Sequence, residues 1–135
     1  MREHHNFRFG RLALLVATFA TFAVLTPSAA RAQDASVKTA TMHAGLAAKA
    51  GDLATVKKHM HHVLNCLEGK SGKDYDASAG DPCKGVGAAY AAGTPNEMKV
   101  QEVVRLLNVG ESLDSMKAAQ DVAEAAAAEL EDIGN

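Results

Sequence analysis

Three histidines stand close together in the chain, at His59, His61 and His62, and Cys66 follows in the same stretch. Imidazole nitrogens suit copper, nickel, zinc and haem iron as ligands. On a helix with about 100° per residue, His59 and His62 share a face because they stand at i and i+3, whereas His61 points in another direction. The spacing therefore predicts that His59 and His62 can coordinate the same ion.

A third ligand is expected from the segment before this stretch. Residues 34–50 are rich in alanine and predict a helix, and residues 52–68 predict the next one. Gly51 ends the first helix and Asp52 caps the second, so the short connection makes them antiparallel neighbours. His43 lies about two turns before this corner and His59 about two turns after it. The predicted metal site is therefore His43, His59 and His62.

Weaker candidate ligands are Met42, Met60 and His61, which are sequence neighbours of the three histidines. A thioether favours Cu(I), so the two methionines would suit copper. Sequence neighbours on a helix point about 100° apart, however, and do not simply join the same ion. The expected ion is copper or zinc. Because free imidazole has a pKa near 6.5, binding is expected to weaken as the pH falls through roughly 6 to 7.

Other cofactors and catalysis have less support in the sequence. A covalent c-type haem needs Cys-x-x-Cys-His, which is absent. Non-covalent haem with His and Met axial ligands stays an alternative, although aromatic residues make up only 4% of the chain and a haem pocket needs them. Residues 74–85 fail as an EF-hand because Gly85 occupies the twelfth position. No serine elbow or phosphate-binding loop is present, so the protein is expected not to be an enzyme.

The first 32 residues have the pattern of a cleaved secretory signal peptide. Arginines precede a mostly apolar run at residues 12–25, and Ala30-Arg31-Ala32 forms a small-residue cleavage site. A periplasmic or secreted location is therefore expected, without a membrane anchor after cleavage. Loss of four arginines and one glutamate takes the net charge from −2 to −5. This acidic balance argues against nucleic acid and anionic membranes as partners and is compatible with cations.

The two cysteines, Cys66 and Cys83, are expected to form a disulfide. Both lie in the part that follows the signal peptide, and paired cysteines are usual in small exported domains. The bond would stabilise the fold by roughly 3 kcal/mol on a chain-entropy estimate. It would also pin the glycine-rich loop of residues 69–93 onto the helix that carries the histidines.

Residues 33–135 are expected to form one all-α domain. The predicted helices span residues 34–50, 52–68, 95–109 and 111–133, with Gly110 ending the third. The predicted architecture is an antiparallel up-down-up-down four-helix bundle with a long disulfide-pinned loop between helices two and three. The leading function is binding of copper or zinc for sequestration, delivery or tolerance. The alternative is a non-catalytic structural or protein-interaction domain without a metal, in which the loop or an alanine-rich groove meets a protein partner.

Overall fold

A computed structural model describes residues 27–134, and these contain helices and no strand. The all-α class is therefore confirmed for this part of the chain. Most of the predicted signal peptide, residues 1–26, lies outside the described residues. Two short 3₁₀ turns, η1 and η2, follow the second helix. The elements are α1 (Pro27–Ala48), α2 (Leu53–Glu68), η1 (Gly69–Ser71), η2 (Ala77–Ala79), α3 (Pro95–Glu111) and α4 (Met116–Gly134).

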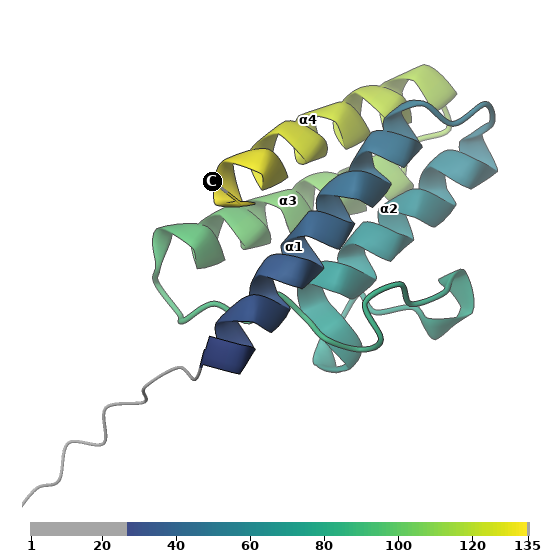
Figure 1. Cartoon of the computed structure of the whole chain (residues 1–135). Helices are drawn as coiled ribbons and strands as arrows, with labels where there is room; N and C mark the ends of the chain where they lie inside the picture. The colour runs from purple at the N-terminus through teal and green to yellow at the C-terminus, as the bar shows by residue number, and fades with distance from the viewer. Residues whose placement is uncertain (1–26, 135) are drawn as a thin grey trace, which may run out of the picture.

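The four helices form a bundle in which α1 packs along both α2 and α4, and α3 packs along α4 (Figure 1). Three of the four buried apolar residues of α1 are alanines, so the helices approach closely. Larger side chains of α2 and α3 fill the remaining core. The up-down-up-down order of helix directions stays a prediction. The fully buried residues include Ala40, Ala44, Ala47, Met60, Leu64, Leu107, Ala123 and Leu130.

The corner between α1 and α2 forms as the sequence predicts. Asp52 is the N-cap of α2, and its carboxylate accepts hydrogen bonds from the backbone N–H and the hydroxyl of Thr55, both at 2.8 Å. Such a cap stabilises a helix by about 1 kcal/mol. The tight corner sets α1 beside α2 and so brings residues on both sides of it face to face.

Several helix boundaries differ from the prediction. Gly110 does not end the third helix, because α3 continues through it to Glu111, and α4 begins only at Met116. Gly110 is buried where a Cβ atom would lie 2.7 Å from Met60 Cε and 2.8 Å from Val122 Cγ1. The glycine therefore serves close packing between helices rather than helix termination. At the other end, α1 begins at Pro27 rather than residue 34, since proline suits the first helical turn.

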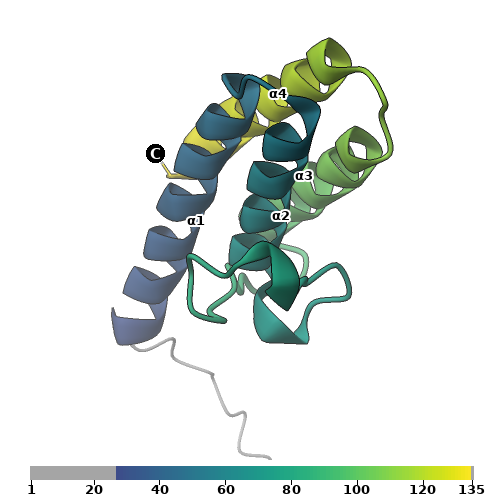
Figure 2. The same ribbon diagram turned by 90° about the vertical axis from the view of Figure 1, so that its right-hand side faces the viewer.

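The long segment between α2 and α3 curls back beside one end of α1 and α2 (Figure 2). The predicted disulfide is confirmed: the Sγ atoms of Cys66 and Cys83 are 2.00 Å apart and their Cα atoms 5.2 Å apart. The hydroxyl of Ser36 on α1 also donates to the carbonyl of Val86, at 3.2 Å. The loop is thus tied to both helices that carry the predicted ligands.

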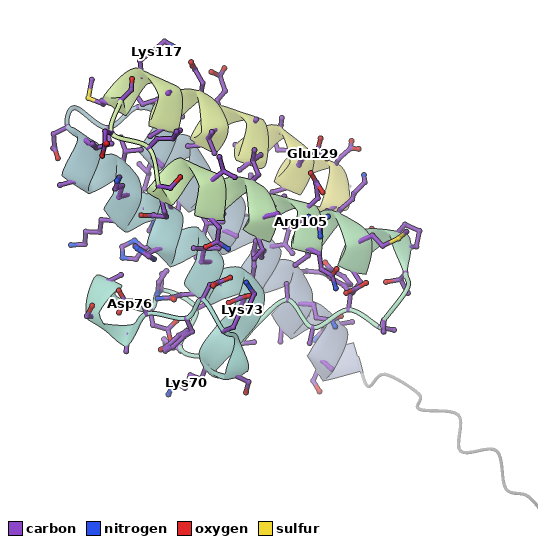
Figure 3. The ribbon with its side chains drawn as sticks, turned by 180° about the vertical axis from the view of Figure 1, so that it is seen from behind. Lys70, Lys73, Asp76, Arg105, Lys117 and Glu129 are labelled. Atoms are coloured by element: carbon purple, nitrogen blue, oxygen red, sulfur yellow. A yellow bond between two sulfur atoms is a disulfide. The ribbon has the colours of Figure 1, made fainter. Side chains whose placement is uncertain are left out.

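Charged side chains lie on the outside of the bundle. Seen from behind in Figure 3, Lys117 and Glu129 project outward from α4, and Lys73 and Asp76 lie on the loop after α2. None of the helices within residues 27–134 combines the length and the apolar character that crossing a membrane requires.

Candidate metal centre

Three imidazole rings meet between α1 and α2. The Nδ1 atom of His43 lies 3.1 Å from Nδ1 of His59 and 3.3 Å from Nδ1 of His62. Among residues 27–134 these histidines form the one group of three or more His, Cys, Asp or Glu side chains whose ligand atoms all lie within 4.8 Å of one another. The corner at Asp52 and the i, i+3 spacing on α2 therefore produce the convergence that the sequence predicts.

The ring of His62 is oriented by the loop after α2. Its Nε2 atom lies 2.7 Å from the carbonyl oxygen of Ala79. A carbonyl oxygen can only accept a hydrogen bond, so Nε2 carries the proton and donates. In the neutral ring this leaves the lone pair on Nδ1, the atom that faces His43. Metal-binding histidines commonly have their second ring nitrogen held in this way.

In neutral rings, the three Nδ1 atoms cannot all carry a proton, so unprotonated Nδ1 atoms outnumber protonated ones in the cluster. Nδ1 of His62 carries a lone pair, as shown above. His43 and His59 cannot both carry a proton on Nδ1, because two N–H groups 3.1 Å apart would point at each other. In neutral rings, at least two lone pairs are therefore directed into the same small space. Such an arrangement favours a shared cation.

The surroundings keep two of these rings neutral. Burial, and after it the neighbouring His62 and His59, lower the pKa of His43 to about 4. Burial also lowers the pKa of His59, with further contributions from His62 and Lys58. His43 is buried, whereas His59 and His62 are half-buried. The lone pairs of His43 and His59 therefore stay available for a metal ion at pH values where a free imidazole is already protonated.

Asn65 holds the loop turn that orients His62. This fully buried side chain donates through Nδ2 to the carbonyls of Asp76 and Gly80, both at 2.7 Å. Its Oδ1 accepts from the backbone N–H of Asp76 at 2.8 Å. Ala79 lies within the clamped turn. Gly80 has φ +100°, and a Cβ atom there would lie 3.1 Å from His62 Nε2, so this close approach requires glycine.

Asn65 has no part in the site predicted from the sequence. The available signal was its position between Leu64 and Cys66, in a run of buried residues on α2. A buried amide must find hydrogen-bond partners, and a loop that returns to this helix is the nearest source of them.

The three weaker candidates lie away from the histidine cluster. Met60 is fully buried and its Sδ and Cε atoms pack toward Gly110 of α3. Met42 is more than half exposed and lines a groove between α1 and α4. His61 points toward α3, where its Nε2 lies 3.3 Å from Oε2 of Glu111. Cys66 is bonded to Cys83, so no thiolate is available from the described part of the chain.

No protein-family model, curated protein or solved structure matches the chain. Function is therefore inferred from the geometry of His43, His59 and His62 and from the loop that packs against them.

Proposed function

We propose that this protein binds a transition metal ion through His43, His59 and His62. The observation that carries the proposal is the convergence of three Nδ1 atoms from two helices, with contacts of 3.1 and 3.3 Å. In a tetrahedral site with metal–nitrogen bonds of about 2.0 Å, ligand nitrogens lie about 3.3 Å apart. The two contacts of His43 already match this spacing, and the ligand atoms of His59 and His62 lie within 4.8 Å of each other.

The proposed role is sequestration, delivery or tolerance of the metal outside the cytoplasm. The Cys66–Cys83 disulfide supports an oxidising compartment, since such bonds persist there. The amino-terminal pattern of the sequence points the same way. The proposal assigns no catalytic residue and treats the protein as a binding protein rather than an enzyme.

The test is a calorimetric titration of the disulfide-bonded protein with Zn²⁺ and Cu²⁺. One ion per chain is expected. Replacing His43, His59 or His62 with alanine should lower the affinity by more than about 100-fold, because loss of an outer-shell partner alone costs roughly 10- to 100-fold. His61→Ala is the matched control, since it removes a histidine of the same helix that points toward Glu111.

Two results would reject the proposal. The first is a wild-type protein that binds neither ion more tightly than the variant lacking all three ligand histidines. The second is an equal loss of affinity in His59→Ala, His61→Ala and His62→Ala. That result would mean that the histidines bind metal as a flexible cluster and not as a defined site. Circular dichroism of each variant separates a loss of ligand from a loss of fold.

A further inference from the structure

We infer that the ion is a divalent cation such as Zn²⁺, held by the Nδ1 atoms of His43, His59 and His62 in a four-coordinate site whose fourth position is open. This inference rests on the proposed function and narrows it from copper or zinc to divalent ions. It excludes Cu⁺ as the ion for which the site is built. Three observations carry it: the positions of Cys66, Met42 and Met60, the compactness of the ring cluster, and the lack of a fourth side chain in the group among residues 27–134.

Within residues 27–134, the sulfurs closest in sequence to the histidines are held elsewhere. Cys66 and Cys83 are joined in a disulfide, which removes both thiolates. Met60 directs its thioether toward Gly110, and Met42 lines the groove between α1 and α4. Soft thiolate and thioether ligands select Cu⁺, whereas imidazole suits zinc and the other divalent ions. The donor set of three imidazoles therefore favours a divalent ion.

The ring cluster has the shape of a triangle with similar sides. The ring centroids of His43, His59 and His62 lie 5.3, 4.6 and 5.5 Å apart. No ring lies far from the other two, and the ligand atoms of all three lie within 4.8 Å of one another. One ion can therefore contact all three rings.

Among residues 27–134, no side chain is a candidate for the fourth position. The metal-competent group contains three histidines and no carboxylate or thiolate among the described residues. Ala79 does not supply a ligand from the loop, because its carbonyl oxygen lies at Nε2 of His62, the ring nitrogen that points away from the proposed ion. His59 and His62 are half-buried, so solvent reaches one side of the cluster. Three protein ligands with water in the fourth position is the pattern of an open zinc site, whose exogenous ligand exchanges.

The first experiment compares Zn²⁺ with Cu⁺, using the disulfide-bonded protein and competing chelators under anaerobic conditions. Zn²⁺ is expected to bind one per chain, with affinity lost in His43→Ala and His59→Ala and unchanged in Met42→Leu. Cu⁺ is expected to bind no better to the wild type than to the variant lacking the three histidines. Tight Cu⁺ binding that needs the histidines and falls in Met42→Leu or Met60→Leu would overturn the inference and leave the proposed function standing.

The second experiment uses Co²⁺ as a spectroscopic probe of the same site. Four-coordinate Co²⁺ gives intense visible absorption bands and six-coordinate Co²⁺ gives weak ones. Intense bands that shift when azide is added are expected, because azide would replace the exchangeable ligand. Weak bands, or intense bands that azide does not change, would overturn the four-coordinate open site. Absence of any histidine-dependent Zn²⁺ or Co²⁺ binding would instead reject the proposed function itself.

Discussion

Nδ1 of His43 lies 3.1 Å from Nδ1 of His59, although the two residues are 16 positions apart and belong to different helices. Two charged imidazolium rings would repel each other at this distance. The contact therefore requires that at least one ring be neutral, and it links the protonation of the site to its ability to hold an ion.

Metal affinity is expected to persist to lower pH than free imidazole would allow. Free imidazole has a pKa near 6.5, whereas burial and the neighbouring rings lower the pKa of His43 to about 4 and also lower that of His59. A proton competes with the ion only when the pH approaches the pKa of the ligand. Proton competition at His43 and His59 is thus expected at lower pH than the window of roughly 6 to 7 that the sequence predicts.

A pH series of Zn²⁺ affinity on the disulfide-bonded protein measures this. Affinity that has already collapsed at about pH 6 would show that His43 and His59 titrate like free imidazole in solution.

Asn65→Ala is expected to weaken both the fold and the metal site. The variant loses three hydrogen bonds, including the acceptor for the N–H of Asp76. Leaving buried polar groups without partners costs about 2–4 kcal/mol in the free energy of unfolding. Zn²⁺ affinity should fall by roughly 10-fold or more, because the turn that carries Ala79 is no longer held against His62.

Ser78→Ala is the control for Asn65→Ala, since Ser78 is exposed and bonds to Asp76 in the same turn. Denaturant unfolding and Zn²⁺ titration of both variants provide the comparison. Unchanged affinity in a folded Asn65→Ala protein would contradict a role for the clamp at the metal site.

Glu111→Gln is expected to stabilise the protein in mild alkali and not in acid. Burial raises the pKa of Glu111 to about 7, and the charge of Lys57 opposes this effect only in part. Between pH 4.5 and about 7 the folded state holds a proton that the unfolded state has lost, so stability is greatest in acid and falls as the pH rises through 7. Oε1 of Glu111 also lies buried without a hydrogen-bond partner.

Glutamine removes this penalty of burying a carboxylate. One pKa unit corresponds to about 1.4 kcal/mol, and partial solvent exposure screens the effect, so we expect about 1–2 kcal/mol of stabilisation at pH 8. At about pH 4, below the ordinary pKa of a glutamate, the difference should be close to zero. Glu129→Gln, at an exposed position of α4, is the control and should show no such pH dependence. Equal unfolding free energies of wild type and Glu111→Gln at pH 8 would contradict the prediction.

Two glycine-to-alanine substitutions are expected to have opposite effects. At Gly87 a Cβ atom would lie 2.8 Å from the backbone carbonyl carbon and oxygen of Glu68, which cannot move without disturbing the end of α2. We expect Gly87→Ala to cost about 1–3 kcal/mol. At Gly45, within α1, a Cβ atom would meet no atom within 4 Å. Gly45→Ala should therefore stabilise the helix by about 0.5–1 kcal/mol.

Thermal and denaturant unfolding of the two glycine variants measure these effects. A Gly87→Ala protein as stable as the wild type would show that the loop is not packed against the end of α2 as described.

Local features of the sequence were sufficient to predict much of the fold. The i, i+3 spacing of His59 and His62, the cap at Asp52 and the pairing of two cysteines depend on near neighbours or on simple counts, so they can be read without a structure. The existence of four helices follows from the same local patterns. So does the expectation that His43 meets His59, because a short corner between helices leaves little freedom.

Tertiary structure decided the features that depend on residues far apart in the chain. The propensity of Gly110 predicts a helix end, yet the residue lies inside α3. It is glycine there because Met60 and Val122 leave no room for a side chain. The same packing turns the Met60 sulfur away from the histidines. The orientation of His62 depends on a backbone carbonyl from the loop, and carbonyl positions carry no residue-type signal. The convergence of the three histidines was thus predictable from helix geometry. The tautomer of His62, the burial of His43 and the distance of the Met60 sulfur from the cluster depend on the packed fold.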